Sequence, residues 1–158
     1  MAGHPQIPAW AGVPIAFTPE DGHGRLFPHN DTMVITVRVE EADVHCVLVD
    51  RGSSTDILFV FAFDQMWIPR SRLTRAKRPL KGFNGDLVEA LGQIELPVCF
   101  GRGTEAHTGI NFDVVDLPYT YNVIMGRGTL NKFGAAVDQN YLCMKIPGPS
   151  GVIMIHGD

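Results

Sequence analysis

A short pattern that occurs twice in the chain narrows the range of possible folds more than any other feature. Val47–Gly52 reads VLVDRG and Val123–Gly128 reads VIMGRG, so both segments contain three apolar residues, one variable residue and then Arg-Gly. A residue with a hydroxyl group follows each pattern. An apolar run that ends at a glycine is typical of a buried strand that enters a tight turn. The repetition therefore favours a fold made of two similar halves, each with a strand that leads into a tight loop.

Alternating residues predict a β-hairpin around the first copy of this pattern. From Thr32 to Asp50 two apolar runs are separated by a polar connection, Glu40 to Asp43. Successive residues of a strand point to opposite faces of a sheet, so one set in the first run is expected to face the core. The expected core set is Met33, Ile35, Val37 and Val39, and the opposite set is Val34, Thr36 and Arg38.

Turn residues predict two further hairpins. Asn84-Gly85 lies between alternating runs and supplies the positive φ values of a tight hairpin turn. Gly82 and Gly92, within the arms of this hairpin, indicate bends or a close approach of the backbone. Another strand is predicted over 110–115, and the last segment of the chain reads as two strands around Pro-Gly-Pro-Ser-Gly.

The segment STDILFVFAFDQM, which follows the first copy of the pattern, is compatible with two structures. Ser54 or Thr55 is a suitable cap for a short helix, with Asp56 in its first turn. Phe59 and Phe63 would then share one side of the helix. The aromatic residues suit a strand equally well, so both structures stay open, with the helix preferred.

Composition limits the possible functions. The net charge of −4 at pH 7 opposes binding to a phosphate backbone, and the basic stretch Arg70–Lys81 is interpreted as a solvated loop, so a nucleic-acid partner is not expected. Cys46, Cys99 and Cys143 are far apart and odd in number, which favours reduced thiols and an intracellular location. No Cys or His pair has the spacing of a metal site, so neither a metal nor another cofactor is expected. The longest apolar run, Ile57–Phe63, is too short to span a membrane.

Proline and glycine suggest a division of the chain. Residues 1–31 contain both residues repeatedly and read as a flexible extension. Residues 32–158, where the alternating patterns begin, are predicted to form one domain.

Asp50 is the candidate reactive residue, because it ends an apolar strand. Burying an isolated carboxylate is costly unless it is hydrogen-bonded or neutralised. Gly52 allows a sharp turn, and the hydroxyl groups of Ser53 and Ser54 are expected to reach back to the carboxylate. If two such carboxylates meet, they share one proton, and one acts as a base while the other acts as an acid. The alternative from these residues alone is that Asp50 opens an ordinary Asx turn.

The order of three motifs resembles that of a retropepsin, the aspartic protease of retroviruses and LTR retrotransposons. These motifs are VLVDRGSSTDILF, LKGFNGD and YNVIMGRGTLNKF, and they look most similar to those of gypsy-type retrotransposon proteases of plants. The resemblance implies an all-β, half-barrel fold with one or two short helices, functional as a homodimer. Each chain would bring one catalytic Asp50, which agrees with Gly126 in the matching position of the second copy.

The same resemblance assigns further roles. Gly82, Phe83, Asn84 and Gly85 would form a flap that closes over an extended peptide. An activated water would attack the peptide carbonyl directly, without a metal or other cofactor. The substrate would be the polyprotein of the element that encodes the chain.

Arg51 departs from the family pattern, which has a small residue after the catalytic Asp. In the family a hydroxyl at this position bonds across the dimer, and Arg cannot reproduce that geometry. Two guanidinium groups near the two-fold axis would repel each other and favour ionised Asp50, unless Arg51 extends outward. Arg127 in the second copy is expected to make a structural contact near the interface. A catalytically decayed module that dimerises and binds peptides is therefore the alternative function.

Overall fold

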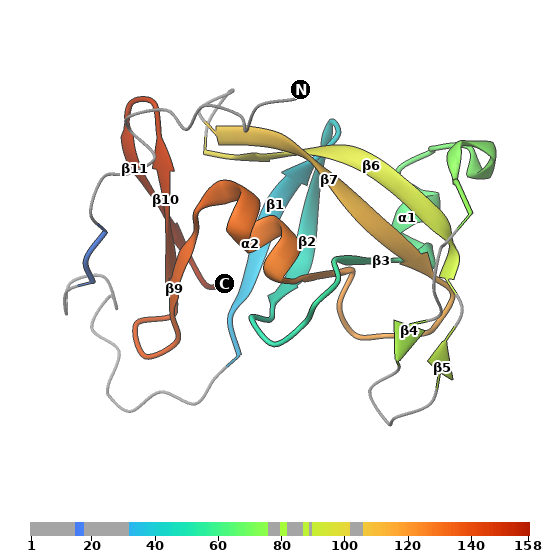
Figure 1. The fold of residues 1–158 in the computed structure, drawn as a ribbon, viewed down its shortest axis with the longest axis horizontal. Helices are drawn as coiled ribbons and strands as arrows, with labels where there is room; N and C mark the ends of the chain where they lie inside the picture. Colours follow the sequence, from blue (N-terminus) through green and yellow to red (C-terminus); the bar gives the residue numbers. More distant parts are fainter. Residues whose placement is uncertain (1–14, 18–31, 76–79, 82–86, 89, 102–105) are drawn as a thin grey trace, which may run out of the picture.

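A closed six-stranded barrel forms the body of the protein (Figure 1). The computed structural model describes residues 15–17, 32–75, 80–81, 87–88, 90–101 and 106–158. The strand order in the barrel is β1-β2-β8-β3-β7-β6, and β6 pairs with β1 to close it. The barrel strands are β1 (Val34–Val39), β2 (Ala42–Val49), β3 (Ile57–Phe59), β6 (Ala90–Phe100), β7 (Ala106–Val115) and β8 (Val123–Met125).

A separate three-stranded sheet and short helices accompany the barrel (Figure 1). The strand order of this sheet is β11-β10-β9, and all of its pairings are antiparallel. The remaining elements are α1 (Val60–Gln65), the 3-10 helix η3 (Arg70–Arg72), β4 (Leu80–Lys81), β5 (Leu87–Val88), α2 (Arg127–Phe133), β9 (Ala136–Asp138), β10 (Cys143–Gly148) and β11 (Gly151–His156). The all-β fold class with two short α-helices is confirmed.

The first hairpin has the predicted faces. Met33, Ile35, Val37 and Val39 are buried, whereas Thr36 and Arg38 are exposed. The predicted turn was too long, because Val39 pairs with Ala42 and only two residues connect the strands. Glu40, the first of these two, adopts the positive φ of 56° that a short hairpin turn requires.

The helix that was predicted for the segment STDILFVFAFDQM begins later than expected. Ile57–Phe59 is a strand, and the helix α1 begins at Val60 with Phe59 as its N-cap. β3 lies between β7, to which it is parallel, and β8, to which it is antiparallel. Barrel closure therefore overrides the local capping signal, and Ser54, Thr55 and Asp56 lie in the loop before the strand.

The later hairpins agree with the turn signals where the structure describes them. β4 pairs with β5, with Leu80 opposite Val88 in an antiparallel ladder, but the predicted turn residues Asn84-Gly85 lie outside the described part. A Cβ atom on Gly92 would lie 2.7 Å from the carbonyl oxygen of Thr74, which confirms the predicted close approach. The predicted strand at 110–115 is longer and begins at Ala106, and the final hairpin is formed by β10 and β11.

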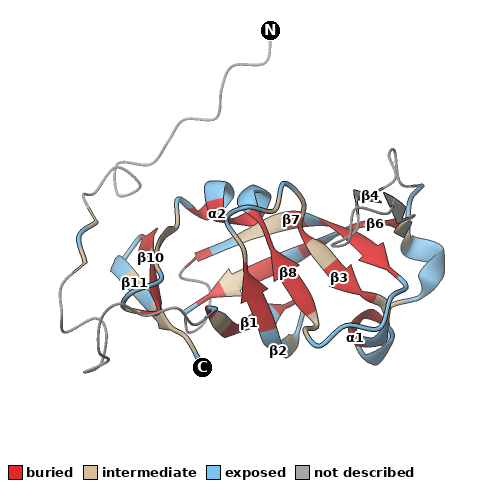
Figure 2. Ribbon diagram, turned by 90° about the horizontal axis from the view of Figure 1, so that it is seen from below, coloured by how far each residue is buried: buried red, intermediate tan, exposed pale blue. Residues whose placement is uncertain are grey.

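One continuous core fills the barrel and extends beneath α2 and the three-stranded sheet (Figure 2). Val47, Val49 and Met125 reach this core from β2 and β8. A smaller cluster of Leu48, Phe59 and Ile124 forms separately from the main core. In the described part of the chain, no helix has the length and apolar character needed to cross a membrane. The division at residue 31 stays a prediction, since only 15–17 are described before residue 32.

Candidate active site

The two copies of the repeated pattern lie side by side. β2 and β8 pair in parallel, with Val47 opposite Val123 and Val49 opposite Met125. Immediately beyond this ladder the N–H of Asp50 donates to the carbonyl oxygen of Met125 at 3.0 Å. Because parallel strands end at the same edge, the loops that follow them meet there. We call Asp50–Asp56 the first loop and Gly126–Thr129, which is the N-cap and the first turn of α2, the second loop.

Asp50 is half-buried at the start of the first loop. The backbone N–H of Gly52 donates to its Oδ1 atom at 2.9 Å, and the N–H of Ser53 donates to its carbonyl oxygen at 3.2 Å. The turn therefore has the Asx form. The expected hydroxyl contact from Ser53 is not formed, because this hydroxyl donates to the carbonyl oxygen of Thr55 at 2.7 Å. Ser54 is exposed, so the backbone of Gly52 is the group that positions the carboxylate.

Gly126 is required by the close approach of the two loops. A Cβ atom at this position would lie 2.3 Å from the carbonyl oxygen of Thr55 and 2.7 Å from that of Ser53. Its φ of −99° is accessible to any residue, so space rather than backbone conformation excludes a side chain. The N–H of Arg127 donates to the same Ser53 carbonyl at 2.9 Å, while the Arg127 side chain is exposed.

Asp56 makes a buried contact between the loops that the sequence did not indicate. Its Oδ1 atom accepts hydrogen bonds from the N–H of Gly126 at 2.7 Å and from the hydroxyl of Thr129 at 2.8 Å. Its Oδ2 atom accepts the N–H of Thr129 at 3.1 Å. Asp56 is 6% exposed and Thr129 is 1% exposed. The sequence feature that could have indicated this contact is the position of both residues beside apolar strands: Asp56 precedes β3 and Thr129 follows β8, and these two strands are antiparallel.

Burial sets the pKa of Asp56. Desolvation raises this pKa above its ordinary value of 3.8, and the nearby carboxylate of Asp113 raises it further. The hydrogen bonds from Thr129 and Gly126 oppose the shift without cancelling it. Asp113, on β7, is itself buried and accepts a hydrogen bond from the side chain of Gln93 at 2.8 Å.

Arg51 extends to β9, beside the first loop. Its Nη1 atom donates to the carbonyl oxygen of Val137 at 3.4 Å, and the side chain is exposed. An open hollow of about 280 Å³ lies here, lined by Arg51, Val137, Asp138, Gln139 and Asn140. The Arg51 side chain therefore extends outward, as the second of the two expectations had it, and its guanidinium group donates to β9 of the three-stranded sheet.

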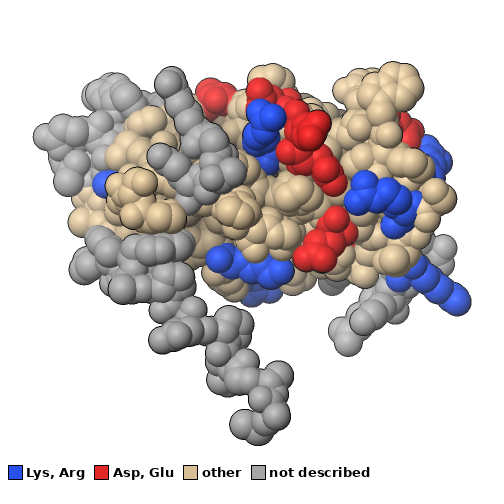
Figure 3. Space-filling view, turned by 90° about the horizontal axis from the view of Figure 1, so that it is seen from above, with Lys and Arg blue, Asp and Glu red and all other residues tan. Residues whose placement is uncertain are grey.

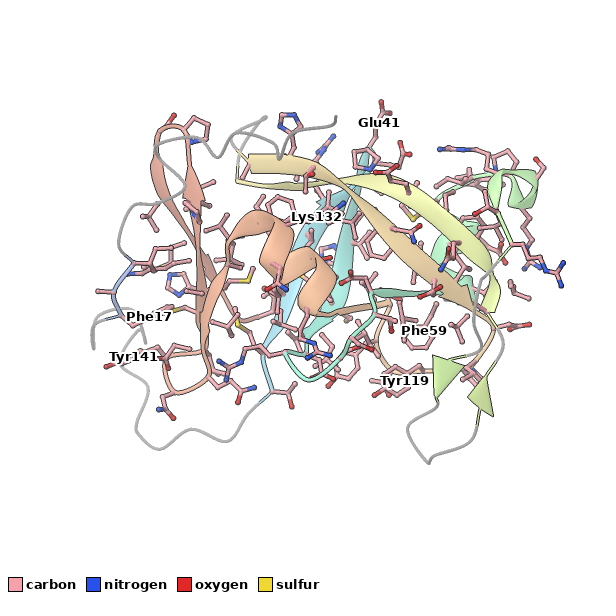
Figure 4. All side chains as sticks on the ribbon, viewed as in Figure 1. Phe17, Glu41, Phe59, Tyr119, Lys132 and Tyr141 are labelled. Carbon is pink, nitrogen blue, oxygen red and sulfur yellow. The ribbon has the colours of Figure 1, made fainter. Side chains whose placement is uncertain are left out.

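A small cluster of buried apolar side chains adjoins Asp50. Side chains alternate along a strand, so Asp50 continues the face of β2 that carries Leu48 rather than the core face of Val47 and Val49. Leu48 packs with Ile124 and Phe59 in the smaller cluster. Aromatic rings extend this cluster: the centroids of Phe59 and Tyr119 lie 4.9 Å apart (Figure 4), and those of Tyr119 and Tyr121 lie 5.7 Å apart.

Solved structures with a similar fold are known. The retroviral protease-like domain of Ddi1 from Leishmania major matches with a TM-score of 0.59 and 15% identity, over 82% of this chain and 95% of that one. A retropepsin-like aspartic protease from Rickettsia conorii matches with a TM-score of 0.55 and 18% identity, over 78% and 81%. The fold is retropepsin-like. No family model and no curated protein matches the chain.

The retropepsin-like fold confirms the coarser part of the resemblance in the sequence. The link to a gypsy-type element of plants stays a prediction, as do the homodimer and the roles of Asp50, Arg51, Gly52, Ser53 and Ser54. The expected flap residues, Gly82, Phe83, Asn84 and Gly85, lie outside the described part, although β4 and β5 on either side are paired.

Charged residues of the described part do not gather into a further site. No group of three or more His, Cys, Asp and Glu side chains in this part could hold a metal ion. In the basic stretch, Arg70 pairs with Asp64 at 2.8 Å and Arg72 lies 3.7 Å from Glu40. Figure 3 shows acidic and basic side chains interspersed over one face of the protein. These contacts agree with the interpretation of the stretch as a solvated segment.

Proposed function

We propose that this chain is an aspartic endopeptidase domain that acts as a homodimer, with Asp50 from each copy as the catalytic pair. The observation that carries the proposal is the parallel pairing of β2 and β8, which brings the Asp50 loop against the second loop within a retropepsin-like fold. Gly126 occupies the position that matches Asp50, and a side chain there would collide with backbone carbonyls. One chain therefore supplies one carboxylate, and the second must come from another copy.

The chemistry follows from two carboxylates in one site. Like charges in contact cannot both ionise, so the two Asp50 side chains would share one proton. The ionised member would take a proton from a water as that water attacks the peptide carbonyl, and the protonated member would donate to the carbonyl oxygen. The N–H of Gly52, at 2.9 Å from Oδ1, would hold each carboxylate in place.

The outer edge of β9 is the surface we propose for dimerisation. β9 pairs with β10 along one edge, and in the described ranges no strand pairs with its other edge. The guanidinium group of Arg51 reaches Val137 on this strand, so β9 lies close to the first loop. Pairing of β9 with its counterpart would bring the two first loops together by two-fold symmetry.

The substrate we propose is an extended peptide with apolar side chains. Leu48 and Ile124 are buried on the Asp50 side of the sheet, and Tyr119, which packs on Phe59 of the same cluster, is 41% exposed and offers an aromatic surface to the peptide. The hairpin that contains β4 and β5 would close over the peptide as a flap. By the motif order, the peptide would belong to the polyprotein of a gypsy-type retrotransposon, processed inside the cell.

A second candidate is a dimerising, peptide-binding module without catalysis. Arg51 favours it, because this cation stands where the family has a small residue and lies at the edge proposed for dimerisation. Such a module would bind the same apolar peptides and would leave them intact.

Cleavage of a peptide library by the purified chain at mildly acidic pH tests the proposal. Asp50→Asn is expected to reduce the rate at least about a thousandfold, since it removes the acid–base pair. Asp43→Asn is the matched control, because Asp43 is an exposed acid at the opposite end of β2. Sedimentation of both variants and of the wild type reports dimer formation.

The outcomes separate the two candidates. Cleavage that disappears in Asp50→Asn and persists in Asp43→Asn supports the endopeptidase. A dimer that binds library peptides without cleaving them supports the non-catalytic module. Cleavage that is equal in the wild type and in Asp50→Asn would exclude Asp50 as the catalytic residue.

A further inference from the structure

The link between the two loops depends on one buried side chain. The Asp56 carboxylate accepts the N–H of Gly126, the N–H of Thr129 and the hydroxyl of Thr129. The N–H of Arg127 also donates to the Ser53 carbonyl, and the N–H of Asp50 donates to Met125 at the end of β8, just before the second loop. Asp56 is therefore the only side chain of the first loop that binds the second loop in the described structure.

We propose that Asp56 is a positioning residue for Asp50, with a carboxylate that fixes the first loop against the start of α2. This inference rests on the proposed endopeptidase function. Asp56 ends the loop that Asp50 begins, and the backbone carbonyl of Asp56 accepts the N–H of Asp113 on β7. One end of the first loop is thus fixed to the second loop by Asp56 while the other end presents Asp50. A displacement of about 1 Å in a catalytic group can cost about a hundredfold in rate.

The three donors require a carboxylate rather than an amide. In Asp56→Asn, the amide oxygen can replace Oδ1 and accept from Gly126 and the Thr129 hydroxyl, but the NH₂ group then faces the N–H of Thr129. In the opposite orientation the NH₂ group faces the N–H of Gly126 instead. Either orientation leaves one buried N–H opposite another donor, which is destabilising at that contact.

Space around the carboxylate is equally restricted. A Cβ atom on Gly128 would lie 2.5 Å from Oδ2 of Asp56, so the second loop carries glycine where the carboxylate approaches. A longer acid at position 56 has no room to reach the same donors without displacing this backbone. The contact is therefore specific to the length and the two acceptor oxygens of aspartate.

Two readouts on the full chain test this proposal. Amide hydrogen exchange at Gly126 and Thr129 is expected to accelerate at least about tenfold in Asp56→Asn, with smaller changes in β6 and β10. For a peptide that the wild type cleaves, kcat is expected to fall about thirtyfold to a hundredfold while KM changes less than about threefold. Asp113→Asn is the matched control, since Asp113 is a buried acid beside Asp56 that contacts Gln93 rather than the second loop.

A second, milder variant guards against a failure of Asp56→Asn to fold. Thr129→Val keeps the side-chain volume and removes only the hydroxyl donor, so it is expected to give about threefold faster exchange at Gly126 and a proportionate loss in kcat. Exchange at both amides that equals that of Asp113→Asn would overturn the proposal, as would faster exchange spread evenly over the chain. If the wild type cleaves no peptide, the endopeptidase proposal fails, and the exchange result still decides whether Asp56 holds the loops together.

Discussion

The two loops begin alike in sequence and differ in what they contribute. Each follows an apolar strand and contains Arg-Gly, and the strands before them pair in parallel. The first loop begins with the half-buried carboxylate of Asp50 and leads into β3. The second loop begins with Gly126, which is the N-cap of α2. Because glycine has no side chain, this residue accepts no side-chain hydrogen bond from the N–H groups of the first turn.

This difference explains why the first loop can begin with a carboxylate and the second loop cannot. The first loop approaches the second so closely that Gly126 has backbone carbonyls of Ser53 and Thr55 where a side chain would begin. The second loop in turn supplies the donors that satisfy Asp56. It therefore acts as a support for the first loop, and it has no space for an acidic side chain at Gly126.

The largest expected effect on stability comes from adding one methyl group to the supporting loop. Gly126→Ala is expected to lower the free energy of unfolding by about 3 kcal/mol or more, because the new Cβ would meet two backbone carbonyls that cannot rotate away. Gly52→Ala, its counterpart in the first loop, is expected to cost about 1 kcal/mol, since its Cβ would lie 3.2 Å from the movable Oδ1 of Asp50.

Urea unfolding of the two variants measures this contrast. Gly52→Ala is also expected to reduce cleavage more than its effect on stability implies, because the atom it displaces belongs to the proposed catalytic group. Equal losses of stability in both variants would mean that the loops are not asymmetric in the way the structure describes.

Much of the fold could be predicted where side chains alternate strictly. The buried set of Met33, Ile35 and Val37 followed from a period of two residues, which only one face of a sheet can satisfy. The same reasoning misassigned the start of α1, because Ile57–Phe59 is apolar throughout and such a short run fits a strand or a helix. Its place between β7 and β8 depends on pairings with residues far along the chain.

The meeting of the two loops was predictable from the sequence, and the contacts that hold them together were not. Asp50 and Gly126 were identified because the two copies of the pattern align, and the structure brings their loops together. The Asp56–Thr129 contact joins residues 73 positions apart, and neither residue type is unusual by itself. The direction of the Ser53 hydroxyl was mispredicted because the nearer acceptor, the Thr55 carbonyl, depends on the path of the loop.

Asp56, where the two loops meet, is expected to make the stability of the protein depend on pH. Because the pKa of Asp56 is raised in the folded chain, the unfolded chain releases its proton first as pH rises above 3.8. The stabilisation that Asp56 contributes is therefore fully present below pH 3.8, and it is lost as the pH rises from 3.8 through the raised pKa of the folded chain. The carboxylate of Asp113 is the charged neighbour in the described part that adds to this shift, and Gln93 donates to it.

Urea unfolding at a series of pH values isolates this contribution. The difference in free energy of unfolding between the wild type and Asp56→Asn is expected to decrease as pH rises across that window. In Asp113→Asn the pH range over which this stabilisation is lost is expected to narrow, because one cause of the raised pKa of Asp56 is removed. A difference that increases with pH would mean that the hydrogen bonds to the carboxylate outweigh its desolvation.

The smallest expected effect concerns the arginines that the loops share. Arg51 lies at the proposed dimer edge and donates to Val137 at 3.4 Å, whereas Arg127 is exposed on α2 and contacts the first loop through its backbone. Arg51→Ser is expected to raise kcat/KM about threefold, since removing two like charges near the two-fold axis favours the dimer and the shared proton. Arg127→Ser, the control, is expected to leave kcat/KM unchanged. A loss of cleavage in Arg51→Ser would instead show that the contact with β9 outweighs the repulsion, and that Arg51 supports the first loop from outside as Asp56 does from within.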